Sequence, residues 1–261
     1  MFINNIDKTV LKLFFIYIVI CFFMLSCQRN RLDAQNVKAM IVEESGIFVK
    51  NGLIVSPTQI KNLNKIIEVV GKDKASQIFI DTLNDERWEV RAFSAYLLGE
   101  IKNKKYVQEL TSLQKDKIIV VSGFATMSLK KIGEDNDTYD GILYLLKTLK
   151  DPAASFVDRM VAADLIGVIN DRRAVPYLID ILYKIEKPSI RDQILKALGA
   201  IGDERAVPVI DEFLESHQSL SMNCQFALGA LGKIGNKNAV DVLINFIQNV
   251  DNDLLLSPHI S

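Results

Sequence analysis

The chain has 261 residues, of which 49% are apolar and 24% are charged, and its net charge is −1. A chain of this length and composition can bury a core of its own, which excludes wholesale disorder. The near-neutral charge provides no basic field for a nucleic acid. Its only histidines are His217 and His259, which argues against a histidine-based metal site or catalytic triad. We therefore expect no nucleic-acid partner, no metal and no cofactor.

Two lysines precede a short apolar run at the N-terminus. The run LFFIYIVICFFML (13–25) holds 13 uncharged residues, whereas a helix that spans a membrane needs about 20. A positive end followed by an apolar run of this length is typical of a signal peptide that directs export. We therefore expect residues 1–26 to be a signal peptide.

Ser26 and Cys27 follow the apolar run directly. This arrangement resembles the signal of bacterial lipoproteins, although Met24 stands where the commonest signal has Leu. The resemblance implies that Cys27 becomes the N-terminus and carries fatty acyl chains such as palmitate, which would anchor the protein in a membrane of the bacterial envelope. The alternative is an uncleaved anchor helix in which Cys27 stays unmodified. The sequence does not decide between the inner and the outer membrane.

Residues 27–56 join the lipid site to the body of the chain. The stretch QRNRLDAQN (28–36) is polar and suits a tether. Asn51 and Gly52 stand between β-prone residues, and Asn-Gly is a strong signal for a two-residue hairpin turn. We expect a small β-hairpin over residues 46–56 that caps the first repeat.

The body of the chain repeats itself at intervals of about 32 residues. Each copy has a small or polar residue two positions before a recurring aliphatic residue, as in LGAIGDERAVP (198–208). The anchor positions of these copies are Glu68, Gly99, Lys130, Gly167, Gly199 and Gly232. The interval from Lys130 to Gly167 is the longest, and we place its extra residues in a longer turn over 134–141.

Each copy contains two helical patterns joined by a short turn. Ser155 and Ser189 each stand three residues before an Asp, as in a capping box at the start of a first helix. Gly202 is expected to end such a helix in a left-handed conformation. Asp171 and Asp203 are expected to cap the second helices that follow.

The repeated pattern, seen most fully in IRDQILKALGAIGDERAVPVIDEFL (190–214), resembles HEAT repeats of the short type also found in phycobilin lyase subunits. The resemblance covers residues 57–252 and leaves residues 253–261 as a C-terminal tail. It implies an all-α fold, a right-handed α-solenoid of about six helix pairs. Neighbouring pairs would share one core, and the second helices would line the concave side.

Three arginines, Arg91, Arg159 and Arg191, open first helices at equivalent positions. The resemblance implies that they form an inter-repeat ladder with carboxylates such as Asp85 and Asp203. The functional alternative is a row that binds anions. Trp88 opens a first helix as well, and we expect it to pack in the core, with a partner-binding anchor as the alternative.

Motifs of enzymes are absent from the sequence. It contains no phosphate-binding loop, no G-x-S-x-G and no C-x-x-C. The His-Glu dipeptides that bind iron in HEAT-type hydroxylases are absent too. Cys224 stands where earlier copies have an arginine, and we expect it to be a buried, inert thiol. We therefore expect no catalytic residue and no small-molecule substrate.

These observations favour a lipid-anchored scaffold or adaptor that binds a protein partner on its concave face. Exposed positions of the second helices would form the binding surface, and aromatic residues there are favoured anchors. The residues proposed for it are Glu109, Tyr144, Lys147, Tyr177, Asp180, Glu212 and Asn245. They can also be read as ordinary solvated positions. The alternative functions are an enzyme or enzyme subunit related to the phycobilin lyases, and a structural spacer; the partner and the oligomeric state stay open.

Overall fold

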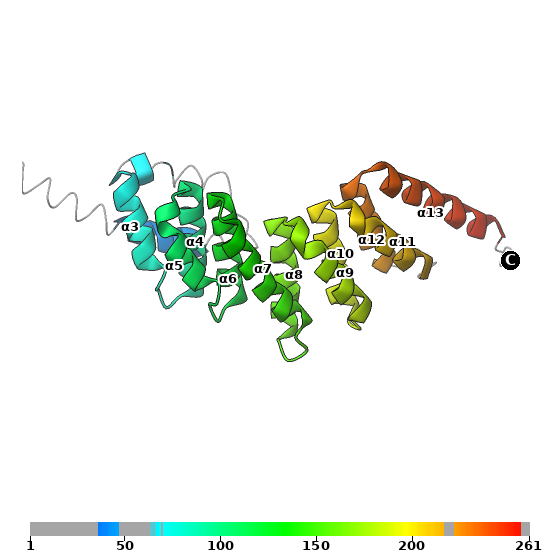
Figure 1. The fold of residues 1–261 in the computed structure, drawn as a ribbon, viewed down its shortest axis with the longest axis horizontal. Helices are drawn as coiled ribbons and strands as arrows, with labels where there is room; N and C mark the ends of the chain where they lie inside the picture. Colours follow the sequence, from blue (N-terminus) through cyan, green and yellow to red (C-terminus); the bar gives the residue numbers. More distant parts are fainter. Residues whose placement is uncertain (1–35, 47–63, 65, 69, 217–221, 257–261) are drawn as a thin grey trace, which may run out of the picture. The chain divides into compact units, whose positions relative to one another are not determined.

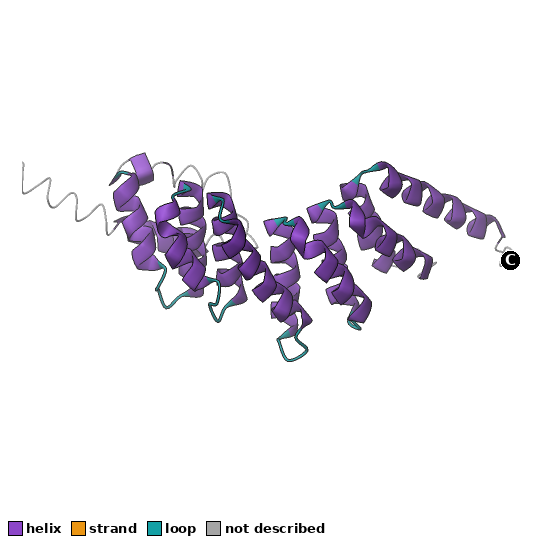
Figure 2. Cartoon of the chain, in the orientation of Figure 1, coloured by secondary structure: helices purple, strands orange, loops and turns teal. Residues whose placement is uncertain are grey.

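A computed structural model describes residues 36–46, 64–216 apart from 65 and 69, and 222–256 (Figure 1). Every regular element in these ranges is a helix, and none of the described residues forms a strand (Figure 2). This confirms the predicted all-α class. The expected signal peptide, Cys27 and the hairpin turn at Asn51 and Gly52 lie outside the described residues.

The chain divides into two compact units, residues 1–97 and 98–261. In the first unit, a helix at residues 36–46 precedes α3 (Lys72–Thr82), and α4 (Trp88–Ile101) begins there. The helix at 36–46 buries Val37 and Ile41, four residues apart on one helical face. Lys38 forms an ion pair with Asp81 of α3, with 3.6 Å between nitrogen and oxygen. This helix differs from the tether and hairpin expected over residues 27–56.

The second unit holds the end of α4 and then a regular alternation of first and second helices. The first helices are α6 (Ile119–Ile132), α8 (Phe156–Ile169), α10 (Pro188–Ile201) and α12 (Met222–Ile234). The second helices are α5 (Val107–Leu113), α7 (Asp135–Lys150), α9 (Val175–Lys184), α11 (Val207–Ser216) and α13 (Lys237–Leu256). Short 3₁₀ turns precede three of them: η1 (Lys104–Tyr106), η2 (Arg172–Ala174) and η3 (Glu204–Ala206).

The first helices of this unit pack on one another in chain order, α6 on α8, α8 on α10 and α10 on α12. Each second helix from α5 to α11 packs against the first helix that follows it. Neighbouring repeats therefore share one continuous core, as expected for an α-solenoid. The apolar residues at helical spacing form that core, among them Leu129, Ile166, Leu198 and Leu231, all fully or almost fully buried.

Glycines at the anchor positions set the distance between the first helices. A Cβ atom on Gly167 would stand 3.0 Å from the Cα atom of Ala197, and one on Gly199 would stand 2.6 Å from the Cα atom of Ala230. The backbones of α8, α10 and α12 therefore approach more closely than a side chain at these two positions would allow.

The helix ends match the sequence predictions at some positions and correct them at others. Ser155 caps α8, and its hydroxyl accepts a hydrogen bond from the backbone N–H of Asp158 at 3.0 Å. Gly202 ends α10 in the left-handed conformation, with φ at 67°. The prediction for Ser189 is wrong, because α10 already begins at Pro188 and Ser189 lies inside it. Proline is favoured at the first helical position, where its missing N–H costs little.

Two predicted boundaries also change. Residues 135–141 form no long turn but the beginning of α7, which follows the left-handed Gly133 almost directly. The extra residues of this repeat lengthen α7 and the loop 151–155 instead. At the C-terminal end, α13 continues to Leu256, past the predicted boundary at residue 252.

Candidate partner-binding face

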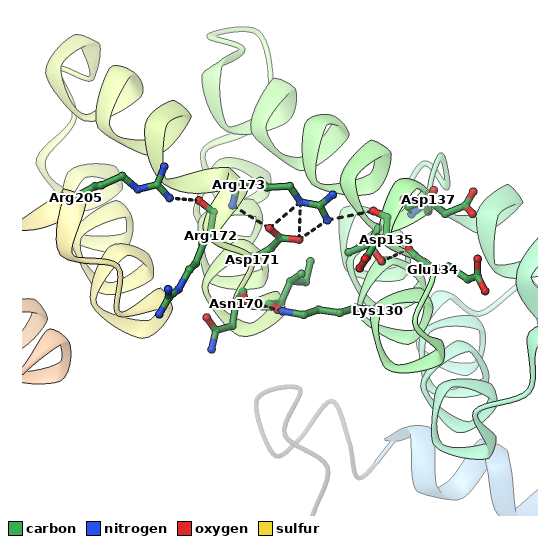
Figure 3. Close-up of polar contacts among 12 residues, drawn as sticks. Lys130, Glu134, Asp135, Asp137, Asn170, Asp171, Arg172, Arg173 and Arg205 are labelled. Carbon is green, nitrogen blue, oxygen red and sulfur yellow. Dashed lines mark hydrogen bonds and ion pairs between the residues drawn. The ribbon is translucent and has the colours of Figure 1, made fainter.

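The turns between first and second helices carry an Asp-x-Arg motif that links neighbouring repeats (Figure 3). In the fourth complete pair, Asp203 accepts hydrogen bonds from the backbone N–H of Arg205 at 3.0 Å and from the Nε and Nη2 atoms of its guanidinium group. The same guanidinium donates to the carbonyl of Arg172, one repeat earlier, at 2.9 Å. Asp171 and Arg173 repeat this arrangement, with the carbonyl of Asp135 as the acceptor at 3.1 Å.

These contacts shift the titration of the two aspartates. Hydrogen bonds from the Arg205 side chain lower the pKa of Asp203 to about 2, and the Arg173 side chain lowers the pKa of Asp171 in the same way. Lys130, one repeat earlier than Asp171, donates to the carbonyls of Ile169 and Asn170 at the end of α8. The cations and carboxylates of these turns are therefore engaged in holding repeats together.

The arginines that open the first helices donate hydrogen bonds to main-chain carbonyls of the segments that precede those helices. Arg159 donates to the carbonyl of Leu149 at 3.0 Å, and Arg191 donates to the carbonyl of Glu186 at 3.3 Å. Arg91 donates to the carbonyls of Asp85 and Glu86. Leu149 lies at the end of α7, whereas Asp85, Glu86 and Glu186 lie in the loops that lead into the next first helix. The pKa of Asp85 is lowered chiefly by the hydrogen bond from the Arg87 side chain and in smaller part by the charge of Arg91, so the expected attraction between Arg91 and Asp85 is present.

A row of exposed and half-buried side chains runs across the second helices α7, α9 and α11. Tyr177 of α9 is 43% exposed, and its hydroxyl lies 2.9 Å from that of Tyr139 on α7. Tyr183, also of α9, is 61% exposed and donates to the carboxylate of Glu212 on α11 at 2.5 Å. We call Tyr139, Tyr177, Tyr183 and Glu212 the second-helix row.

Arg173 joins the inter-repeat turns to this row. Its guanidinium carbon lies 4.8 Å from the ring centroid of Tyr139, within the range of a cation–π contact. The hydrogen bond between the hydroxyls of Tyr139 and Tyr177 raises the pKa of Tyr139, and the bond that Tyr183 donates to Glu212 raises the pKa of Tyr183. Both shifts favour the neutral, hydrogen-bonding form of Tyr139 and Tyr183.

Only some of the residues predicted to bind a partner lie in or beside the second-helix row. Tyr177 and Glu212 belong to the row, and Asp180 is exposed beside it and pairs with Lys184 one helical turn later. The hydrogen bond from Lys184 lowers the pKa of Asp180. Of the other predicted positions, Lys147 and Asn245 are exposed on α7 and α13, and Tyr144 is half-buried.

Glu109 does not belong to an exposed face. Its side chain is half-buried, and its Oε2 atom is buried with no hydrogen-bond partner among the described residues. The short helix α5 is oriented by Leu110 and Leu113, which are both buried, and Glu109 directly precedes the first of them. The prediction that Glu109 faces outward is therefore wrong.

Sequence reasoning missed Tyr139 and Tyr183. A signal for Tyr183 was present, because it follows the buried Leu182 directly and stands three residues after Asp180, on the same helical face. No comparable sequence pattern indicates Tyr139. Its contact with Tyr177 depends on how α7 and α9 pack, which the local sequence does not determine.

A hollow of about 490 Å³ lies beside Asp180 and Lys184, at the ends of α7 and α9. Its cationic lining residues are Lys150, Arg159, Lys184 and Lys187, and Glu186 is the only carboxylate among the lining residues. Phe156 is exposed there, with the Lys187 ammonium 5.5 Å from its ring centroid. An exposed aromatic ring among cations suits an acidic protein segment.

The remaining candidates from the sequence occupy structural positions. Cys224 is buried on α12, and Trp88 is half-buried at the start of α4. In the described part of the chain, no three side chains of His, Cys, Asp or Glu gather into a group that could hold a metal ion. None of the helices in that part is both long and apolar enough to cross a membrane.

Comparisons with known proteins match the chain to one repeat family and to solved structures. The family described as HEAT repeats matches residues 142–220, which confirms the HEAT repeats predicted from the sequence in that range. A subunit in the CpcE–CpcF complex of phycocyanin lyase from a Nostoc species is 23% identical, with a TM-score of 0.43 over 65% of this chain and 69% of that one. Human deoxyhypusine hydroxylase is 16% identical, with a TM-score of 0.37 over 88% of this chain and 97% of that one. No curated protein sequence matches the chain.

Proposed function

We propose that this HEAT-repeat chain is a scaffold or adaptor that binds a protein partner through the second-helix row and performs no chemistry itself. The observation that carries the proposal is the pair of exposed tyrosines, Tyr177 and Tyr183, held in place by hydrogen bonds to the neighbouring second helices. Tyrosine is enriched among the residues that dominate binding energy at protein interfaces. Because their hydroxyls are already fixed, these rings lose little conformational freedom on binding.

Charge indicates the kind of partner. Asp180 and Glu212 place carboxylates in or beside the row, which disfavours a polyanion such as nucleic acid. The adjoining hollow is rich in cations and exposes Phe156. We therefore propose a protein partner that lays polar and aromatic groups on the row and an acidic segment in the hollow.

We further propose that the chain is anchored by lipid at Cys27 on the envelope side of a bacterial membrane. The support is the sequence pattern of a short apolar run followed by Ser26 and Cys27. The intact mass of the protein from membranes tests this. We expect loss of residues 1–26 and gain of acyl chains, with both changes abolished in Cys27→Ala; a full-length, unmodified mass would contradict the anchor.

Photocrosslinking tests the partner-binding proposal. A photoreactive phenylalanine analogue replaces Tyr183 in one variant of the full chain and Val168 in the control, and crosslinking is done in the intact envelope. Val168 is also exposed but lies on the first helix α8. We expect one protein adduct from position 183 and none of that mass from position 168. Adducts at neither position, or at both with equal yield, would overturn the proposal.

A further inference from the structure

Arg159 differs from the two other arginines that stand at its repeat position. Arg91 donates from Nη1, and Arg191 from Nη2, to main-chain carbonyls five or six positions earlier. Arg159 instead donates from Nε to the carbonyl of Leu149, ten positions earlier. Its Nη1 and Nη2 atoms form no hydrogen bond and no ion pair with the residues that the structure describes. The end of this guanidinium group therefore keeps its donors for a ligand.

The loop before α8 leaves these donors open. Residues 151–155 close on themselves, because Asp151 accepts hydrogen bonds from the backbone N–H of Ala153 at 2.8 Å and of Ala154 at 3.2 Å. None of the carbonyls of this loop, which the structure describes throughout, accepts a hydrogen bond from Arg159. The 3.0 Å bond from its Nε atom to Leu149 holds the guanidinium group at the end of α7. A group held in this way loses little conformational freedom when a ligand binds.

Arg159 lines the hollow of about 490 Å³ at the ends of α7 and α9. Lys150 and Lys187 are exposed in the same lining, and neither forms an ion pair with a described residue. The hollow also has an apolar wall, made by the buried Ile181 and the half-buried Ile185. Two parallel N–H groups of a guanidinium match the two oxygens of a carboxylate. The lining therefore suits a carboxylate carried on an aliphatic stem, as in glutamate.

We propose that Arg159 is the specificity-determining residue of the hollow, with its Nη1 and Nη2 atoms binding both oxygens of one glutamate carboxylate in the partner. This inference rests on the proposed function, which places an acidic segment in the hollow, and it names the residue that recognises that segment. Lys150 and Lys187 add attraction from exposed positions, where solvent screens their charges more strongly. A lysine at position 159 would keep the charge and lose the paired donors.

Fluorescence anisotropy with a labelled hexaglutamate peptide tests this proposal on the full chain in detergent at low salt. The parent chain should bind hexaglutamate and should not bind a labelled hexaglutamine peptide. Arg159→Lys should weaken hexaglutamate binding about tenfold, whereas Arg191→Lys, the matched change one repeat later, should leave it unchanged. The proposal is overturned if the parent does not bind hexaglutamate, or if Arg159→Lys loses no more affinity than Arg191→Lys.

A second variant guards against a folding defect in Arg159→Lys. Lys150→Gln removes one exposed charge from the lining and leaves Arg159 in place, so it should weaken hexaglutamate binding severalfold with unchanged helical circular dichroism. The control is Lys233→Gln, an exposed position on α12 outside the hollow. Equal affinities for these two variants would contradict binding in the hollow.

Competition with inorganic phosphate distinguishes a carboxylate site from a phosphate site. At constant ionic strength, millimolar phosphate should leave hexaglutamate bound, and displacement would overturn the assignment to a carboxylate. These titrations do not involve the second-helix row, so they test the hollow alone. The adduct from position 183 tests the row, and either proposal can therefore fail without the other.

Discussion

The close approach of Gly199 to the backbone of α12 predicts that Gly199→Ala destabilises the protein, although alanine is the better helix former. The added Cβ atom would stand 2.6 Å from the Cα atom, 2.9 Å from the Cβ atom and 3.3 Å from the carbonyl oxygen of Ala230. Two of these atoms belong to the backbone of α12, so no side-chain rotation relieves the clash. The helices α10 and α12 must instead move apart.

The magnitude follows from two opposing effects. Forcing extra volume into a packed core costs about 1–3 kcal/mol, and replacing glycine by alanine within a helix returns up to about 1 kcal/mol. Gly229 of α12 provides the matched control, because nothing lies within 4 Å of a Cβ placed on it. Gly229→Ala should therefore gain up to about 1 kcal/mol, and the two variants should differ in free energy of unfolding by about 1–3 kcal/mol.

Urea unfolding followed by helical circular dichroism measures this difference. We expect the midpoint of Gly199→Ala to fall below that of the parent chain and the midpoint of Gly229→Ala to equal or exceed it. If Gly199→Ala unfolds at the same or a higher urea concentration than Gly229→Ala, α10 and α12 do not approach as closely as described.

Two further predictions concern the caps and the inter-repeat turns. The pKa of Asp203 lies near 2 in the folded chain and at its ordinary value of 3.8 in the unfolded chain, so its stabilising effect is complete above about pH 4 and is lost as the pH falls towards 2. The stability that Asp203→Asn loses relative to the parent should therefore be larger at pH 6 than at pH 2.5 in urea titrations; an equal loss at both pH values would refute the bond to Arg205. Ser155→Ala should cost about 1 kcal/mol, whereas Ser189→Ala should be nearly neutral in the same titration, and the reverse order would contradict the observed start of α10.

The repeat made most of the fold predictable. Several copies of one pattern indicated helix pairs that share a core, and the local chemistry of Ser155 and Gly202 correctly predicted one end each of α8 and α10. Asp171 and Asp203 cap the 3₁₀ turns η2 and η3, which lead into the second helices that they were expected to cap. These residues act on backbone groups within a few positions of themselves, so their effect can be read without knowing the rest of the structure. The prediction that Ser189 caps α10 failed because Pro188, a second local signal, already begins the helix.

Features that depend on packing between elements escaped the sequence analysis. The helix at 36–46 is short and has its buried residues, Val37 and Ile41, in a stretch without a cap or a repeat signal. The contact between Tyr139 and Tyr177 joins α7 to α9 through residues 38 positions apart. Its geometry follows from the spacing of the repeats. Glu109 was misplaced because a seven-residue helix is oriented by very few core residues.

The affinity of the crosslinked partner for variants of the second-helix row tests the central claim most directly. The partner captured from position 183 is purified, and its dissociation constant is measured for the parent chain, for Tyr177→Ala, for Tyr183→Ala and for the control Val168→Ala. Residues that dominate an interface cost at least about 1.4 kcal/mol when truncated, or a tenfold loss of affinity. We expect such a loss for at least one tyrosine variant and none for Val168→Ala. Equal affinity for all four proteins would show that the partner binds elsewhere.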